Sequence, residues 1–261
     1  MLLANNKKIH QSWTNNNFAG KDWFRDFLAR NPEISSRTPQ ATSLSRATSF
    51  NKKNGTDFYE NLKQVREKYN FETQNIYNCD ETGCTTVQQC PKVLASKKAK
   101  QVGHATSAER GTLVTVCLAV NAIGNAMPPF FIFPRVKYRP DFVDGGPEGS
   151  DGDSYITDWM TAKSFLKFMK HFKKHSHASK DNPVLLILDN HESHVSIEVI
   201  SYAKSNGITL LTLPPHCSNK LQPLDIAIYS SFKSRYNTAL SNWMLSNPGR
   251  TVTIYQIPGF I

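Results

Sequence analysis

Five consecutive aliphatic residues, Val184 to Leu188, lie between Pro183 and the polar pair Asp189-Asn190. An uninterrupted aliphatic run of this length, bounded by residues typical of turns, predicts a strand that is buried on both faces of a parallel or mixed sheet. The run therefore indicates an α/β fold. Asp189 then lies at the carboxyl end of the strand, where the loops of α/β sheets open into a crevice that binds ligands.

Two further aspartates are placed in a similar way. Asp80 ends the segment Asn75–Asp80, which reads as a strand followed by a turn at Glu81–Gly83, and Asp225 follows Leu221-Gln-Pro-Leu. Each acid alone has a structural explanation: shaping a turn for Asp80, starting a helix for Asp189, and complementing a helix dipole for Asp225. Together, three converging carboxylates would repel one another unless divalent cations were bound, and oxygen ligands are those that magnesium prefers.

The rest of the chain supplies the elements of such a fold. Strands are predicted at 75–80, 110–121, 129–134, 184–188 and 208–213, the second and third forming an antiparallel pair, and 135–157 is predicted to be a surface loop. Helices are predicted at 20–30, 57–71, 161–175 and 195–205, with a last one opened by Gln222-Pro223. From residue 75 onward this order matches an RNase H-like mixed sheet flanked by helices.

The composition narrows the class of protein. The formal net charge is +10, which favours a polyanionic partner such as DNA or RNA, although an excess of charge also promotes solubility. The five cysteines form no CxxC pair, so neither a zinc knuckle nor a disulfide framework is indicated, and reduced thiols are expected. No apolar run approaches the ~20 residues that span a bilayer.

Basic residues gather in two stretches that we predict to contact DNA. The segment 35–53 is rich in serine and threonine, and 97–100 is a lysine cluster that also resembles a nuclear localisation signal. The predicted contacts are Arg37, Arg46, Lys52, Lys53, Lys97, Lys98 and Lys100. For both stretches a solvated basic loop is the alternative interpretation, and a nuclear location is expected.

Two histidines follow Asp189 closely, at positions 191 and 194. Imidazoles here could bind metal or phosphate, but zinc would need further nitrogen or sulfur ligands, and His216-Cys217 is the only nearby pair. We therefore expect His191 and His194 to orient the carboxylates. Ser193 between them lacks the glycine pattern of a nucleophile elbow, so covalent catalysis by serine is not indicated.

Three blocks of the sequence resemble the DDE endonuclease domain of pogo, Tigger and jerky-like proteins. They are Asn78–Gly83, Leu186–His194 and Leu213–Asp225, and segments 111–121 and 129–135 extend the likeness. The resemblance implies an RNase H-like domain in which Asp80, Asp189 and Asp225 are the catalytic acids and hold two Mg²⁺ or Mn²⁺ ions. It also implies DNA as the substrate, with strand cleavage and joining of the freed 3′ hydroxyl to a target.

A second resemblance concerns the amino-terminal part. Segments 19–28 and 42–51 are similar to the later part of the centromere protein B-type helix-turn-helix, a DNA-binding domain. The predicted organisation is therefore a small, all-helical, partial helix-turn-helix domain at 1–55, a linker helix at 56–74 and a DDE endonuclease domain at 75–261. The last domain is expected to be truncated at its carboxyl end, and the sequence leaves pairing into a homodimer open.

Three functional hypotheses follow. The first is a transposon-derived DDE transposase or endonuclease that uses two metal ions to cleave DNA and transfer strands. The alternative is a domesticated, non-catalytic DNA-binding or chromatin protein that retains the fold and the basic surface. The third is a general nuclease of the same fold, with no preference for transposon ends.

Overall fold

The computed structural model describes residues 13, 19–37, 43, 48–89, 94, 106–157 and 159–261. The chain divides into two compact units, Met1–Ser43 and Leu44–Ile261. The first contains helix α2, Lys21–Arg30, as predicted, and none of its residues is buried. Its aromatic side chains contact one another: Trp23 stacks on Phe27 at 5.1 Å between ring centroids and meets the edge of Trp13 at 5.0 Å.

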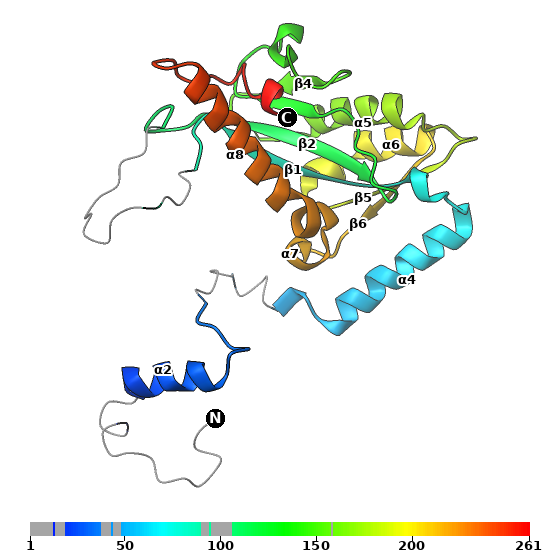
Figure 1. Ribbon diagram of the computed structural model, residues 1–261. Coiled ribbons are helices and arrows are strands. Elements are labelled where there is room, and N and C mark those ends of the chain that lie inside the picture. The colour runs from blue at the N-terminus through cyan, green and yellow to red at the C-terminus, as the bar shows by residue number, and fades with distance from the viewer. Residues whose placement is uncertain are drawn as a thin grey trace. The chain divides into compact units, whose positions relative to one another are not determined.

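The second unit is built on a six-stranded mixed sheet with the order β4-β3-β2-β1-β5-β6 (Figure 1). The strands are β1 Ile76–Thr85, β2 Leu113–Asn121, β3 Phe130–Phe133, β4 Asp151–Ser154, β5 Val184–Leu188 and β6 Ile208–Thr212. The first three form an antiparallel meander, β5 and β6 add parallel to β1 on one side, and β4 adds parallel to β3 on the other. This topology confirms the predicted RNase H-like α/β fold.

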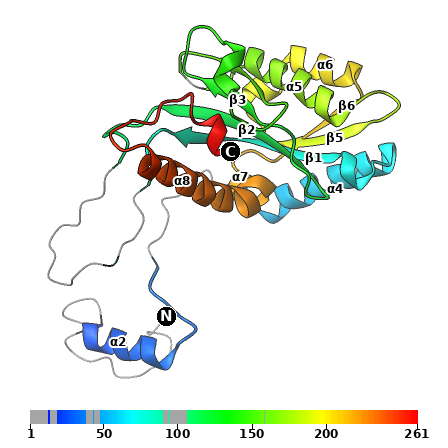
Figure 2. The ribbon, with the colours of Figure 1, turned by 45° about the horizontal axis from the view of Figure 1, so that its top comes forward.

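Helices cover both faces of the sheet (Figure 2). Helices α5 and α6 pack on one face, while α4, the short α7 and α8 lie on the other. Their bounds are α4 Lys52–Tyr69, α5 Ala162–Ser176, α6 Ile197–Ser205, α7 Ser218–Leu221 and α8 Tyr229–Ser246. Three layers follow, so strands at the centre of the sheet are buried on both sides.

The side chains of the central strands alternate between the two cores. In β5, Val184 and Leu186 pack beneath α5 and α6, whereas Leu185 packs beneath α4. In β3, Phe130 and Ile132 belong to the buried apolar cluster under α5 and α6, called here the α5 core. Phe131 belongs to the cluster on the opposite face, under α8, called here the α8 core. Because side chains in a strand alternate between faces, a strand with helices on both sides needs a continuous apolar run. The aliphatic segment 184–188 meets that need.

Side-chain caps mark the starts of α4 and α5. Thr161 accepts a hydrogen bond from the Ser164 amide at the start of α5. Asn51 does the same for the Asn54 amide, so α4 begins at Lys52, earlier than the predicted linker helix. Capping by a side-chain oxygen satisfies an amide that has no partner within the helix. Lys52 and Lys53 consequently lie in the first turn of α4 and not in a loop.

Two predictions of local structure were wrong. Glu81–Gly83 is not a turn, because β1 continues to Thr85 and pairs with β2 from Tyr77 to Thr85. The predicted loop 135–157 contains a 3-10 helix, Pro140–Val143, and strand β4. Strand β4 has a turn-like sequence, Asp-Gly-Asp-Ser, and is held by its neighbours: Asp153 accepts hydrogen bonds from Ser164 and Lys167 of α5.

The carboxyl-terminal residues complete the α8 core. Val252, Ile254 and Ile257 are buried against Tyr236 and Leu240 of α8. Among the residues that the structure describes, no helix is both long enough and apolar enough to cross a membrane.

Candidate active site

Asp80 and Asp189 are brought level by the pairing of β1 with β5. In this parallel pair, Asn78 lies opposite Ile187. The same register, continued by two residues in each segment, sets Asp80 beside Asp189. Strand β5 ends at Leu188, whereas β1 continues to Thr85. Asp80 therefore lies within a strand, and Asp189 lies in the loop that leaves the adjacent strand.

Asp225 reaches the same end of the sheet from a different element. It lies in a π-helical turn, Leu224–Ile228, that leads directly into α8. Hydrogen bonds fix this turn on both sides: the Leu224 amide donates to Asn78 Oδ1 at 3.2 Å, and the Tyr229 hydroxyl donates to the Asp80 carbonyl at 2.6 Å. π-helical turns are rare and occur frequently at functional sites. The sheet and the turn thus hold Asp225 next to β1.

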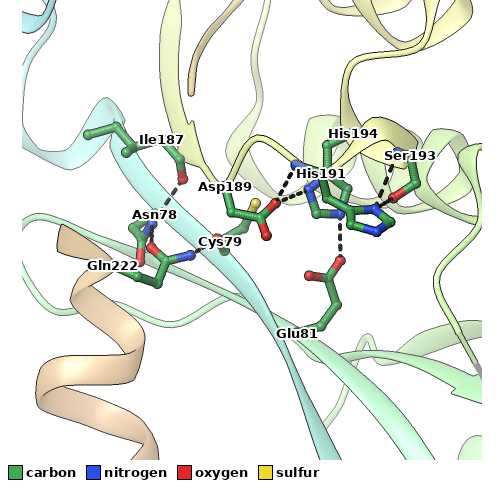
Figure 3. A network of polar contacts seen from close by, with 9 residues as sticks. All are labelled: Asn78, Cys79, Glu81, Ile187, Asp189, His191, Ser193, His194 and Gln222. Carbon is green, nitrogen blue, oxygen red and sulfur yellow. Dashed lines mark hydrogen bonds and ion pairs between the residues drawn. The ribbon is translucent and has the colours of Figure 1, made fainter. Parts of the chain in front are cut away.

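Two buried amides connect the strands to this turn (Figure 3). Asn78 Nδ2 donates to Gln222 Oε1 at 2.6 Å and to the Ile187 carbonyl at 2.9 Å. Gln222 Nε2 donates to the Cys79 carbonyl at 3.1 Å. Gln222 is completely buried. Because buried amides are costly unless they are paired, this network fixes the relative positions of β1, β5 and the segment that carries Asp225.

The second histidine after Asp189 connects two carboxylates (Figure 3). His194 Nδ1 lies 2.6 Å from Asp189 Oδ1, and its Nε2 lies 3.0 Å from Glu81 Oε1. The imidazole is 3% exposed and packs against Phe165 of α5, with 4.1 Å between ring centroids. A ring held on both nitrogens and on one face has a single orientation, so it fixes that of Asp189.

His191 has a different environment. Its backbone amide donates to Asp189 Oδ1 at 3.1 Å, and its Nδ1 lies 2.8 Å from Ser193 Oγ. The side chain is exposed. His191 therefore supports Asp189 through its backbone, while its ring remains available at the mouth of the site.

The electrostatics differ between the two central acids. Burial raises the pKa of Asp80, and the charges of Glu81 and Asp225 raise it further, to about 8. Asp189 contributes in the same direction, while a hydrogen bond from Gln222 acts against the shift. These effects show that the carboxylates lie close enough to repel one another, as groups that share a site do.

His194 supplies a positive charge beside Asp189. Burial acts to lower the pKa of His194, but its hydrogen bonds to Asp189 and Glu81 outweigh burial and raise it to about 10. Burial likewise acts to raise the pKa of Asp189, and the hydrogen bond and charge of His194 reverse this, so the pKa lies below its usual value. At neutral pH, Asp189 is ionised and His194 is an imidazolium.

A cleft of about 390 Å³ opens over Asp80 and Asp189. The charged and imidazole side chains in its lining are Asp80, Glu81, Asp189, His191 and His194. The lining also includes the apolar side chains of Leu113, Trp159 and Met160. The lining of the cleft therefore combines carboxylates with apolar side chains.

The donor set suits a hard divalent cation. Carboxylate oxygens are the preferred ligands of Mg²⁺ and Mn²⁺, and a cation would relieve the repulsion that raises the pKa of Asp80. Within the described residues, no three His, Cys, Asp or Glu side chains are already arranged to hold one ion together. The chemistry of the donors thus fits magnesium or manganese, while the observed geometry includes no complete coordination shell.

The predicted DNA contacts are only partly described. Arg37 is exposed and donates to Ser35 Oγ at 3.0 Å in the first unit. Lys52 and Lys53 are exposed in the first turn of α4 in the second unit. The remaining predicted contacts, Arg46, Lys97, Lys98 and Lys100, lie outside the described residues.

The sequence prediction missed several residues that build the site. Glu81 was assigned to a turn, and neither Asn78 nor Gln222 was singled out, although both amides are buried. Tyr229 was also missed. The available signal was that Asn78 and Gln222 lie two and three residues before the aspartates of their own segments. Their pairing, across 144 positions of sequence, depends on the tertiary fold.

Comparison with known proteins places the site in context. A family model described as "DDE superfamily endonuclease" matches residues 110–255, a range that includes Asp189 and Asp225 and begins after Asp80. The chain is 28% identical over 211 residues to a Cochliobolus lunatus protein named "MFS-type transporter clz9", covering 79% of this chain and 23% of that protein. It is 21% identical over 192 residues to the human "Pogo transposable element with KRAB domain", covering 72% of this chain and 31% of that protein. The chain thus spans less than a third of the length of either relative.

Solved structures show the same fold. The Mos1 strand transfer complex contains a chain that superposes with a TM-score of 0.59 at 12% identity, covering 98% of this chain and 72% of that one. The Mos1 paired-end complex with the left transposon end gives a TM-score of 0.57 at 11% identity, covering 98% and 73%. At this level of identity the likeness concerns the fold alone.

Proposed function

Because the chain belongs to the DDE superfamily endonucleases, we propose that it cleaves phosphodiester bonds of DNA in a metal-dependent reaction and transfers the freed strand, as a transposase does. The observation that supports this proposal is the approach of acids from three distant segments: the pairing of β1 with β5 sets Asp80 level with Asp189, and hydrogen bonds to Asn78 and Asp80 hold the turn that carries Asp225 against β1. Structural stability alone gives no reason to gather like charges at one end of the sheet, whereas a cation site requires several carboxylates close together.

The three aspartates would hold the ions. Asp80, Asp189 and Asp225 provide the carboxylate oxygens, and Mg²⁺ or Mn²⁺ is the proposed cofactor, as two ions per site. When bound, such ions would stabilise the charge that develops on the attacking and leaving oxygens. His194 keeps Asp189 ionised and oriented through a 2.6 Å contact, and the buried amides of Asn78 and Gln222 keep the segments in register.

DNA is the proposed partner. Support comes from the net charge of +10 and from exposed basic residues such as Arg37, Lys52 and Lys53. We assign DNA binding to these residues together with Arg46, Lys97, Lys98 and Lys100, and we propose a nuclear location. The relatives and neighbours named above include a pogo transposable element and transposase–DNA complexes, which agrees with this substrate class.

The proposed domain organisation follows from the same function. We propose that residues 1–55 are a partial helix-turn-helix region that contacts DNA, that 56–74 connect it to the catalytic region, and that 75–261 form the endonuclease domain. The observed α4, from Lys52 to Tyr69, covers most of the connecting segment. Pairing of two copies, as a homodimer, would allow two DNA ends to be processed together.

The decisive experiment measures nicking of supercoiled plasmid in Mg²⁺, in Mn²⁺ and in EDTA. We expect cleavage in either metal, none in EDTA, and a loss of at least about 100-fold in Asp189→Asn and Asp225→Asn, because each removes a charged ligand. Asp181→Asn is the matched control, since Asp181 is exposed in the turn before β5. Cleavage that persists unchanged in Asp189→Asn would refute the assignment.

A second candidate function has one observation in its favour. His194 already places a positive charge between Asp189 and Glu81, so part of the negative charge is balanced by the protein itself. A non-catalytic DNA-binding protein that retains the fold would have this arrangement. Binding with a steep dependence on salt concentration, together with the absence of cleavage in both metals, would favour this function over the first.

A further inference from the structure

One edge of the sheet is open at β6, Ile208–Thr212. This strand is last in the sheet order, and among the strands that the structure describes none pairs with its outer side (Figure 1). Every residue of β6 lines a groove of about 660 Å³. We propose that this edge pairs, in antiparallel orientation, with β6 of a second copy of the chain. The inference names the surface for the pairing of copies that the proposed function invokes, and it is tested without metal or DNA.

The backbone groups that face the open edge follow from the pairing of β6 with β5. The Val184 amide donates to the Gly207 carbonyl at 2.9 Å, and the Leu213 amide donates to the Leu188 carbonyl at 2.8 Å. In a parallel pair of strands, the bonds to one neighbour use every second residue. The odd-numbered residues of β6 therefore bond to β5. The remaining residues of β6 direct their amides and carbonyls toward the open edge: Ile208, Leu210 and Thr212.

The two edges of the sheet differ in their protection against further pairing. Edge strands are commonly protected by charged side chains or by proline. At the opposite edge, β4 carries two carboxylates, Asp151 and Asp153, and a glycine. Strand β6 has the sequence Ile-Thr-Leu-Leu-Thr, which contains neither a charged residue nor a proline. Its edge is therefore suited to receive another strand, as in recognition by strand addition.

The edge of β6 is complementary to a second copy of itself. Its edge-facing residues are spaced evenly about Leu210. A two-fold axis at this position sets Leu210 opposite Leu210 of the second copy, and Ile208 opposite Thr212 of the second copy. In an antiparallel pair, opposed residues whose backbones face each other exchange both hydrogen bonds. Each edge-facing amide and carbonyl thereby gains a partner, and two-fold pairing requires only one surface per molecule.

Apolar side chains beside β6 would be covered by the same pairing. Ile200 of α6 lines the groove and is 47% exposed, and Val195 and Leu210 also line it. A two-fold axis perpendicular to the sheet keeps α6 of both copies on the same face, so Ile200 approaches its counterpart. Exposed apolar side chains that lie next to unpaired backbone groups thus form one continuous interaction surface.

The charges at the two ends of β6 favour the antiparallel orientation. Lys180 and Lys204 line the groove where β6 begins: Lys204 lies in the last turn of α6, and a Cβ atom at Gly207 would lie 2.9 Å from the Lys180 amide nitrogen. Asp57 of α4 lines a pocket with Thr212, where β6 ends. Antiparallel pairing brings the basic end of one strand to the acidic end of the other. An extended segment of a different protein could add to this edge, but neither the even spacing nor the opposite charges select it.

Sedimentation velocity of the full chain, in EDTA and reductant and without DNA, measures the pairing. We expect a monomer–dimer equilibrium with a Kd of about 1–100 µM, as for an interface of modest size. Thr212→Pro removes an edge-facing amide and leaves the bonds to β5 intact, so it should weaken the dimer at least about 10-fold. Ile200→Asp should do the same. Ile123→Asp is the matched control, since Ile123 is 55% exposed in the turn between β2 and β3.

The register is tested by cross-linking at Leu210. In the proposed pair, the two Cα atoms at this position would lie about 5.5 Å apart, within the ~4.4–6.8 Å that a disulfide spans. Leu210→Cys should therefore give a covalent dimer on oxidation. Thr209→Cys should not, because position 209 lies opposite position 211 of the second copy. The wild type sets the background, since its described cysteines are buried.

Three results would overturn the proposal. The first is a wild type that stays monomeric up to about 200 µM, which leaves the edge to a different protein. The second is a dimer that neither Thr212→Pro nor Ile200→Asp weakens; Ile200→Asp changes only an exposed side chain, so it decides if Thr212→Pro fails to fold. The third is equal cross-linking of Leu210→Cys and Thr209→Cys.

The plasmid assay separates this proposal from the endonuclease proposal. Metal-dependent nicking by a wild type that is monomeric refutes the pairing through β6 alone. A dimer that depends on β6 but shows no nicking in either metal refutes the endonuclease proposal alone.

Discussion

At the scale of single residues, the site is defined by one acid that resists ionisation and one that is held ionised. Asp80 is surrounded by Glu81, Asp225 and Asp189, which raise its pKa to about 8 together with burial. Asp189 is paired with His194 and has a lowered pKa. In the absence of metal, the two acids therefore contribute to stability with opposite signs.

Asp80→Asn should stabilise the metal-free protein while abolishing cleavage. The folded-state pKa of about 8 lies above the unfolded value near 4, so the unfolded chain releases its proton first as the pH rises. The contribution of Asp80 to the free energy of unfolding is thus most favourable below pH ~4 and is lost as the pH rises to ~8. In EDTA at pH 8.5 or above, Asp80→Asn should raise the melting temperature by at least ~2 °C, the shift that ~1 kcal/mol produces in a domain of this size. Equal or lower stability of the variant in calorimetry would contradict this.

His194→Gln should destabilise the metal-free protein by about 1–3 kcal/mol at pH 7, since it leaves Asp189 and Glu81 without the cation between them. The folded pKa of about 10 lies above the unfolded value of ~6.5. This stabilisation is therefore complete below pH ~6.5 and disappears as the pH rises through ~10. Urea unfolding at several pH values measures it, and a double-mutant cycle with Glu81→Gln isolates the pair. A deficit in His194→Gln that is independent of pH would point to lost packing against Phe165 instead.

At the scale of elements, α8 and the turn before it are fastened to β1 by side chains that donate to strand carbonyls. Tyr229 donates to Asp80, Lys233 to Gly83 and Tyr236 to Thr85. The donors recur at helical spacing along α8, so one face of the helix follows β1. The helix thereby positions the preceding π-helical turn, which carries Asp225.

Two conservative substitutions separate stability from function in this contact. Tyr229→Phe and Tyr236→Phe each remove one hydroxyl and leave a strand carbonyl without that donor, so each should cost about 1–2 kcal/mol in chemical denaturation. Only Tyr229 is four residues from Asp225 and bonds to the Asp80 carbonyl at 2.6 Å. Cleavage should therefore fall at least ~5-fold in Tyr229→Phe and stay within ~2-fold of wild type in Tyr236→Phe. Equal activity losses would show that α8 does not position the acid locally.

At the scale of the whole molecule, the chain divides into two compact units, Met1–Ser43 and Leu44–Ile261. Among the residues that the structure describes, the three clusters of buried apolar side chains lie in the second unit. The first contains α2, which has no buried residue, and the basic residue Arg37. Within the described part of the chain, both units carry exposed positive charge, and the second contains the buried apolar clusters.

Removing residues 1–43 should leave the melting temperature of the second unit within ~2 °C, because none of its core residues is lost. The same truncation should weaken DNA binding and reduce the slope of log K against log salt by about 1 or more, since basic residues such as Lys21, Arg30 and Arg37 are removed. Calorimetry and fluorescence anisotropy over a salt series measure the two effects. An unchanged slope would contradict a DNA contact by the first unit.

Much of the fold was predictable because its signals are local. The aliphatic run 184–188, the helical spacing of Phe165, Met169 and Phe172, and the antiparallel pair β2–β3 all follow from periodicity. The predictions failed where neighbours override local preference. Strand β4 has a turn-like sequence, and Gly152 fits there because a Cβ atom would lie 2.6 Å from the Phe131 carbonyl oxygen.

By itself, the sequence determined the fold class and the three acid-bearing segments. The reason is that a strand buried on both faces, and the polar residues that end it, form a continuous pattern in the sequence. Only the tertiary structure decided how the acids are surrounded. In the folded protein, β1 continues beyond Asp80, and Glu81 is in hydrogen-bonding contact with His194. Asn78 donates a hydrogen bond to Gln222, which is 144 positions away in the sequence. Burial, charge repulsion and hydrogen bonding depend on distance in space, so no local pattern could specify them.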